Sequence, residues 1–149
     1  MCCSSEKKVV KTDKAPKALG PYSVAIQANG FVFTAGQVGL NPETNTIVEG
    51  GVEAETRQAL TNVKNVLEAA GSNLGLVVKT TVFLLDMNDF AKMNAIYGEF
   101  FTENFPARSA VQVAALPKGA MVEIETIALL ECTCDDDEEC CCCTEAKEE

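Results

Sequence analysis

The spacing of hydrophobic residues predicts two helices. Over residues 52–70 the apolar residues recur at intervals of three and four, the spacing of a helix that buries one side. Glu53 and Glu55 suit the first turn of this helix, where the backbone dipole favours negative charge, and Gly71 suits its end. A second helix is expected over residues 89–103, with a buried side formed by Phe90, Met93, Ile96, Tyr97, Phe100 and Phe101.

Short apolar runs and alternating patterns predict the strands. Residues 22–28 and 31–36 form an expected hairpin around Asn29-Gly30, a pair that favours the tight two-residue turn. A loop rich in Asn, Pro, Thr and Gly covers residues 41–51, and a further strand is expected over residues 76–85. Two short strands joined by Leu-Pro-Lys-Gly close the pattern. The order strand–strand–helix–strand–helix–strand–strand predicts one α+β domain, a mixed sheet with two helices packed on one face.

The strand over residues 76–85 is apolar on both of its faces. Phe83 and Leu85 point to one face, and Val82 and Leu84 to the other, because strand side chains alternate. A strand of this kind normally has both faces buried. Two helices cover only one face, and the pattern leaves no segment for a second layer. We therefore expect another subunit to cover the open face, which makes the protein a homo-oligomer.

The two closing strands carry one arginine and two glutamates among apolar residues. Arg108 lies on the strand face opposite Val111, and Glu123 on the face opposite Val122. If the valines face the core, Arg108 and Glu123 look out on the same side of the sheet and form a site for a small anion. Gln112 shares the predicted outward face with Arg108 and is assigned to a subunit interface.

Charge and cysteine are concentrated at the ends of the chain. The net charge is −10, of which −8 belongs to residues 131–149, so the first 130 residues carry only −2 and offer no basic surface for nucleic acid. All eight cysteines lie at positions 2, 3 and beyond 131, so they form no disulfide framework for the core. The acidic, cysteine-rich segment is predicted to be a disordered tail, and a soft-metal site in it is the alternative. With no transmembrane run or signal segment, a soluble protein is expected, cytoplasmic or, alternatively, mitochondrial.

The residue types that are present limit the chemistry. The chain has no histidine, and no cysteine lies between Cys3 and Cys132. A histidine base, a histidine metal site and a cysteine nucleophile within the domain are therefore excluded. No activated-serine motif and no phosphate-binding glycine loop occurs either. Arginine, glutamate, tyrosine and amides remain. They can hold a carboxylate and position a water, so we expect an easy hydrolysis without a metal or cofactor.

Three blocks of sequence carry a resemblance to a known family. FPARSAVQVAALPKGAMVEIE resembles the signature of the RidA family, the reactive-intermediate imine deaminases. GPYSVAIQANGFVFTAGQVGLNPETN resembles the family's first strands, and VVKTTVFLLDMNDFAKMNAIYGEFF resembles its central strand and second helix. The resemblance covers residues 15–130, between an arm at 1–14 and the tail at 131–149. It implies chorismate-mutase-like subunits in a homotrimer with three sites between them.

The resemblance also implies a reaction and its residues. RidA proteins hydrolyse 2-imino acids, such as 2-iminobutanoate and 2-iminopropanoate, to 2-oxo acids and ammonia. By similarity, Arg108 would bind the substrate carboxylate, Glu123 would position the attacking water, and the backbone of Ala110 would hold that water. The remaining expected pocket residues are Tyr22, Asn94, Ala35 and Gly36. Ala35 stands where members often carry serine, so a hydroxyl contact is missing here.

Other interpretations stay open at this stage. Taken singly, Arg108 is typical of a surface ion pair, Glu123 of a solvated strand residue, Tyr22 of core packing and Asn94 of a buried amide. Members of the broad family have also been described as translation inhibitors with ribonuclease activity, or as proteins that hold unfolded chains. The rivals are thus a non-catalytic carboxylate-binding protein and a chaperone-like or translation-regulating protein. The expected partners are a small-molecule substrate and copies of the same chain, and neither nucleic acid nor membrane.

Overall fold

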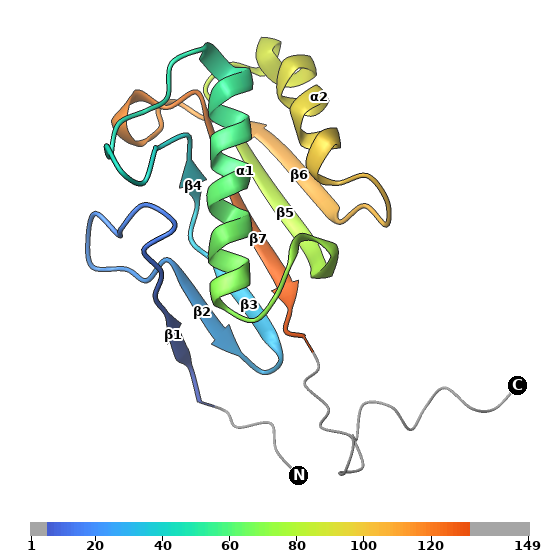
Figure 1. The fold of residues 1–149 in the computed structure, drawn as a ribbon. Coiled ribbons are helices and arrows are strands. Elements are labelled where there is room, and N and C mark those ends of the chain that lie inside the picture. Colours follow the sequence, from blue (N-terminus) through green and yellow to red (C-terminus); the bar gives the residue numbers. More distant parts are fainter. Residues whose placement is uncertain (1–5, 132–149) are drawn as a thin grey trace, which may run out of the picture.

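The computed structural model describes residues 6–131 as one mixed sheet with two helices on one face (Figure 1). This confirms the predicted fold class. The helices are α1 (Gly51–Ala69) and α2 (Phe90–Phe100). The strands are β1 (Lys8–Val10), β2 (Ala25–Ala28), β3 (Phe31–Thr34), β4 (Gln37–Val38), β5 (Val77–Leu84), β6 (Ala107–Gln112) and β7 (Val122–Leu129). None of the described helices is long and apolar enough to cross a membrane.

The strands follow the order β1-β2-β3-β7-β5-β6, and β4 also pairs with β7. All pairs are antiparallel except β5 with β6, which run parallel. The two closing strands, β6 and β7, are therefore not neighbours, because β5 lies between them. β1 falls within the segment predicted as an arm, and β4 was not predicted. At three and two residues, both are too short to show an alternating pattern.

The predicted turns are confirmed, and one helix end is not. Asn29 (φ 49°) and Gly30 (φ 79°) form the tight turn between β2 and β3, and Gly71 (φ 68°) follows α1. The helix α2 ends at Phe100, whereas the pattern predicted residue 103. The backbone of Phe101 is extended while its ring is buried. The chain must turn back there toward β6, and Pro106 disfavours helical backbone at the residue before it.

The core lies between the helices and the sheet. Side chains from both layers are fully buried there, among them Leu60, Leu67, Leu84, Met93 and Ile124. Val82 and Leu84 of β5 both face the helices. These positions follow the predicted periodicity of α1 and the alternation of β5, so the pattern of apolar residues placed this side of the sheet correctly.

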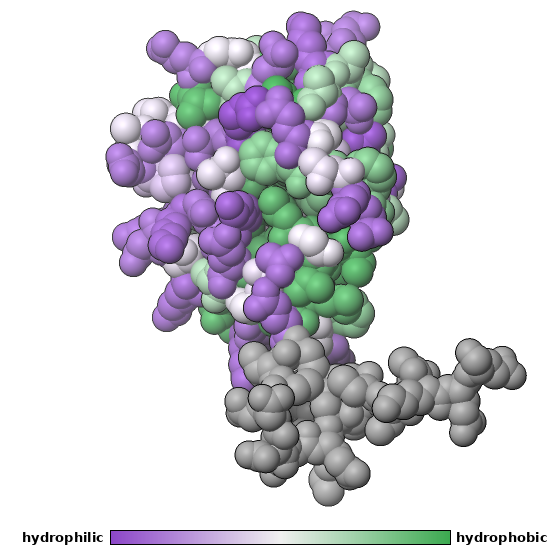
Figure 2. Space-filling model, turned by 45° about the vertical axis from the view of Figure 1, so that its right-hand side comes forward, coloured by the Kyte–Doolittle hydropathy of each residue, from purple (hydrophilic) through white to green (hydrophobic). Residues whose placement is uncertain are grey.

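The opposite face of the sheet is apolar and uncovered. Phe31, Phe33, Val111 and Leu129 lie on it with 36–43% of their surface exposed, and the strand register places Phe83 beside Val111. Figure 2 turns the β6 edge of the sheet toward the viewer and shows hydrophobic surface there between hydrophilic side chains, while the uncovered face lies behind the sheet, on the side away from the helices that stand in front in Figure 1. This face matches the one that we expect a second subunit to cover. The homotrimer remains a prediction.

Candidate functional site

Arg108 lies on the helix-covered side of β6. It pairs in register with Thr80 of β5, whose buried hydroxyl bonds to the hydroxyl of Tyr97 on α2 at 2.8 Å. The Arg108 guanidinium carbon is 4.6 Å from the centre of the Tyr97 ring and 5.5 Å from that of Phe90. The guanidinium is therefore stacked beneath α2.

The prediction that Arg108 and Glu123 share one outward face is wrong. It assumed that Val111 faces the core, but Val111 is 43% exposed on the open face. The face without helices is itself apolar, so the alternation of β6 could not show which side is the core. Gln112 is exposed at the end of β6, and its side chain accepts a hydrogen bond from the Met87 amide at 2.8 Å; its assignment to a subunit interface remains a prediction.

Arg108 forms one wall of a hollow beside α2, which we call the arginine half-site. Its volume is about 480 Å³, and it is lined by Asn94, Tyr97, Gly98, Phe105, Pro106 and Arg108. The structure thus brings together two of the predicted site residues, Asn94 and Arg108. Ala110, two residues further along the same face of β6, is half-buried against the core. Among residues 6–131, no ion pair engages Arg108.

Tyr97 lines the arginine half-site and contacts Arg108, whereas the sequence pattern assigned it only to the buried side of α2. Burial raises the pKa of its phenol, while the Thr80 hydrogen bond and the Arg108 charge act in the opposite direction. The ring faces the guanidinium, and such cation–π contacts contribute about 0.5–2 kcal/mol depending on desolvation. Spacing along a helix shows that a residue is buried but not which charge it supports, so no sequence signal could have identified this role.

Glu123 lies on the other face of the sheet. On β7, it pairs in register with Phe83 of β5 on one side and with Val38 of β4 on the other. Burial raises the pKa of its carboxyl group, and the neighbouring Glu125 adds to the rise. A raised pKa makes the carboxylate a stronger base toward a bound water.

Gly36 leaves room for the Glu123 side chain. A Cβ atom at position 36 would lie 2.7 Å from Glu123 Cδ and 2.8 Å from its Cγ. Any side chain there would therefore displace the carboxylate. Only the family resemblance identified Gly36 as a site residue. The space that Glu123 needs gives a physical reason for a glycine at this position.

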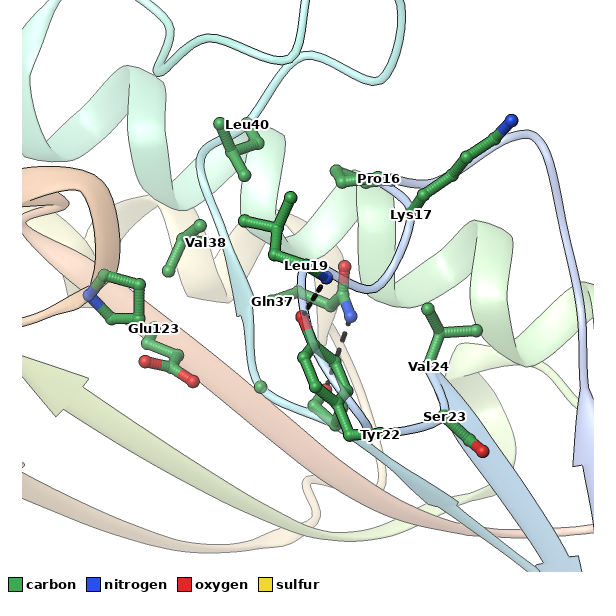
Figure 3. Close-up of a pocket in the computed structure, with 13 residues that line it drawn as sticks. Pro16, Lys17, Leu19, Tyr22, Ser23, Val24, Gln37, Val38, Leu40 and Glu123 are labelled. Atoms are coloured by element: carbon green, nitrogen blue, oxygen red, sulfur yellow. Dashed lines mark hydrogen bonds between the residues drawn. The ribbon is translucent and has the colours of Figure 1, made fainter.

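Glu123 lines a second hollow of about 360 Å³, which we call the glutamate half-site (Figure 3). Tyr22 stands across this cleft from Glu123, with its hydroxyl accepting a hydrogen bond from the Leu19 amide at 3.2 Å. Four predicted site residues meet here: Tyr22, Ala35, Gly36 and Glu123. Most of the other walls are apolar, formed by Pro16, Leu19, Val24, Val38, Leu40 and Pro117.

Comparison with known proteins identifies the family. The model described as Endoribonuclease L-PSP matches residues 12–130. A RutC family protein of Pyrococcus horikoshii is 54% identical over 125 residues, which cover 84% of this chain and 99% of the relative. A mouse protein named 2-iminobutanoate/2-iminopropanoate deaminase is 53% identical over 123 residues, covering 83% of this chain and 91% of that protein. The chain belongs to the RidA family.

The fold of this RidA-family chain is shared by solved structures. The crystal structure of E. coli TdcF with bound serine superposes with a TM-score of 0.79 at 43% sequence identity, covering 83% of this chain and 99% of that one. Family membership and the mixed sheet with two helices are thus established together. The residue roles that the resemblance implies are a separate question, which the geometry of the two half-sites addresses.

The predicted site of this RidA-family chain is divided between the two faces of one sheet. Arg108 and Asn94 lie on the helix side, whereas Tyr22, Gly36 and Glu123 line the other hollow. In register, Glu123 lies three residues along and two strands across from Arg108, or about 10 Å in each direction at ordinary strand dimensions. A small ligand in one subunit therefore cannot contact both charged groups.

Proposed function

We propose that the protein hydrolyses 2-imino acids to 2-oxo acids and ammonia in a site that two subunits complete. The observation that carries this proposal is the placement of Arg108 and Glu123 on opposite faces of the sheet, each in its own hollow. The deaminase name of the mouse relative supports the reaction. The serine bound to TdcF, an amino acid with a carboxylate, supports the class of ligand.

A symmetric oligomer would join the two half-sites. In a ring, each subunit presents one surface to its neighbour on one side and a different surface to its neighbour on the other. The uncovered apolar face supplies the driving force, because Phe31, Phe33, Val111 and Leu129 lose water on contact. Glu123 lies on this same face, so a covering subunit would bring its own surface against the glutamate half-site. The homotrimer implied by the family resemblance meets this geometric requirement.

Arg108 would hold the substrate carboxylate. A guanidinium offers parallel N–H groups that match the two oxygens of a carboxylate. The contact with the Tyr97 ring holds the guanidinium at the wall of the arginine half-site, where a ligand can reach it. Fixing the carboxylate also fixes the adjacent imine carbon, and such orientation can supply a large part of the rate enhancement of an easy hydrolysis.

Glu123 would position the attacking water and take its proton, with the backbone of Ala110 holding the same water. The water oxygen forms a bond to the imine carbon, and the nitrogen gains a proton, giving a carbinolamine. The hydroxyl proton of the carbinolamine then passes to the nitrogen, the carbon–nitrogen bond breaks, and ammonia leaves as the carbon–oxygen double bond of the 2-oxo acid forms. No electron transfer is involved, so arginine, glutamate and backbone groups are sufficient. The apolar walls of the glutamate half-site suit a short apolar side chain, as in 2-iminobutanoate.

A coupled assay tests the proposal. An amino-acid oxidase generates the imine in place, and semicarbazide traps the imine that escapes hydrolysis. We expect the wild-type protein to suppress trapping, and Arg108→Ala to abolish both this effect and 2-oxo acid binding. Arg57→Ala is the matched control, because Arg57 is exposed and, within residues 6–131, its ion-pair partner is Glu99 on the helix surface.

The Glu123→Ala variant separates an enzyme from a carboxylate-binding protein. An enzyme should lose its rate while it still binds the 2-oxo acid product, whereas a binding protein has no rate to lose. If the wild type leaves trapping unchanged for several amino acids, the hydrolysis proposal fails. The ribonuclease described for the family gains no support from these residues, because the chain lacks histidine and its first 130 residues carry a net charge of −2.

A further inference from the structure

Asn62 on α1 is a fully buried polar residue with no place in the proposed chemistry. Its exposed fraction is 0%. The side-chain amide donates to the carbonyl oxygens of Val38 at 3.2 Å and Leu40 at 2.9 Å, and its oxygen accepts a hydrogen bond from Gln58 Nε2 at 2.9 Å. Both amide hydrogens are thus used to hold one short stretch of backbone against the helix. Asn62 itself does not line either half-site.

Glu55, two turns earlier on the same helix, also bonds to backbone outside the helix. It is 4% exposed, and its Oε2 accepts a hydrogen bond from the Met121 amide at 2.7 Å. The helix backbone is in close contact with the chain at this point, because a Cβ atom on Gly39 would lie 2.6 Å from Glu55 Cα. A larger residue at position 39 would force α1 away from the backbone that follows β4.

These two contacts fix the backbone on both sides of Glu123. Met121 lies two residues before Glu123 on the same stretch of chain, and Val38 is its register partner on β4. Gly36, on the segment that leads into β4, provides the space for the Glu123 side chain. In Figure 3, Val38 lies on the same side of the cleft as Glu123. The helix α1 therefore holds the two backbone segments between which the carboxylate sits.

We propose that Asn62 and Glu55 are positioning residues that hold β4 and the start of β7 so that Glu123 is aimed at the substrate. The inference deepens the proposed function and rests on it. Burying an amide and a carboxylate is costly unless each is hydrogen-bonded, and apolar side chains would fill the same space. The two residues act through backbone, and neither touches the substrate.

The test compares kcat and KM for imine hydrolysis in folded, assembled variants. For Asn62→Ala we expect kcat to fall by about tenfold or more, since displacing a catalytic group by about 1 Å can cost about 100-fold. KM should stay within about threefold, because the carboxylate is bound in the arginine half-site of another subunit. Asn73→Ala is the matched control: Asn73 bonds to Glu131, away from both half-sites, and should keep kcat.

If Asn62→Ala does not fold, two variants of Glu55 test the positioning role instead. Glu55→Gln retains an oxygen that can accept the Met121 amide, whereas Glu55→Ala removes it. We expect the Gln variant to keep kcat within about threefold and the Ala variant to lose about tenfold. A purely structural role would lower stability in both Ala variants without this separation of kcat from KM.

The outcomes distinguish the inference from the function on which it rests. If the wild type hydrolyses the imine and folded Asn62→Ala or Glu55→Ala retains kcat, the positioning role is overturned. If the wild type does not hydrolyse it, the proposed function fails, and the carboxyl pKa of Glu123, followed by carbon NMR, becomes the readout. An Asn62→Ala variant should then show this pKa closer to that of an ordinary glutamate, because the surroundings of Glu123 open to water. An unchanged pKa would overturn the positioning role independently.

Discussion

Mixing two inactive variants tests whether the two half-sites come from different subunits. Arg108→Ala destroys the arginine half-site of its own chain, and Glu123→Ala destroys the glutamate half-site of its own chain. If each site combines Arg108 from one subunit with Glu123 from the next, a mixed oligomer contains some intact sites. A site is intact when the first subunit carries Glu123→Ala and the second carries Arg108→Ala.

The expected magnitude follows from counting subunit arrangements. In a random one-to-one mixture, each position in a cyclic oligomer holds either variant with equal probability, so about one quarter of all sites are intact. A site built within one subunit would give no recovered activity. A second mixture combines wild type with the Arg108→Ala, Glu123→Ala double variant. It should keep about one quarter of wild-type activity if the site is shared, because two neighbouring wild-type subunits are then needed, and about one half if the site lies within one chain.

The assay requires proof that mixed oligomers have formed. Two affinity tags on the two variants, captured one after the other from a sample of the co-expressed protein, show that both chains occur in one oligomer. Imine hydrolysis is then measured per site on the whole random mixture, to which the one-quarter and one-half values apply. Arg57→Ala mixed with wild type is the control and should retain full activity, because Arg57 lies outside both half-sites. Verified mixed oligomers without recovered activity, together with the one-half result for the double variant, would refute the shared site.

Three further predictions follow from single contacts. Tyr97→Leu removes the ring that contacts Arg108, so the dissociation constant for a 2-oxo acid, measured by calorimetry, should rise by about 2- to 30-fold. Tyr97→Phe keeps the ring and should keep binding. It removes the hydroxyl that bonds to Thr80, so thermal melts should show a lower melting temperature. Phe33→Asp places a charge on the open apolar face, and size-exclusion chromatography should show smaller species; unchanged assembly would contradict the assignment of that face. Burial raises the pKa of Glu55, so the folded state binds this proton more tightly than the unfolded state. This contribution to stability is lost as pH rises from the ordinary glutamate value through the raised one. The stability of Glu55→Gln relative to wild type should therefore be greater at pH 7 than at pH 4, and thermal melts that show the same difference at both pH values would contradict this.

The sequence pattern predicted the layers of the fold but not the side of the sheet on which each charged residue lies. The periodicity of α1 and the Asn29-Gly30 turn are local signals, and both are confirmed. The face of β6 is not a local property. It depends on β6 pairing with β5 in parallel, and on an apolar open face that makes Val111 resemble a core residue. The expectation that residues 131–149 form a disordered tail falls, beyond Glu131, outside the described residues.

The candidate site shows the same limit. Its residues came from the family resemblance, and chain spacing alone would have placed Arg108 and Glu123 together on one surface. Their separation depends on β5 lying between β6 and β7, which only the three-dimensional arrangement reveals. The supporting residues Tyr97, Asn62 and Glu55 were hidden for a related reason. A helical pattern identifies a buried position, but the atoms that meet it belong to strands distant in the sequence.

On the proposed function, assembly itself would control the protonation of Glu123. In the single subunit, burial and Glu125 already raise the pKa of this carboxyl group. A covering subunit removes more water and raises the pKa further, whereas the guanidinium of the partner's Arg108 favours the charged carboxylate and lowers it. When a substrate carboxylate binds Arg108, it offsets that positive charge, so the pKa of Glu123 should rise on binding. The glutamate would thus become a stronger base at the moment when a substrate is present to receive the water.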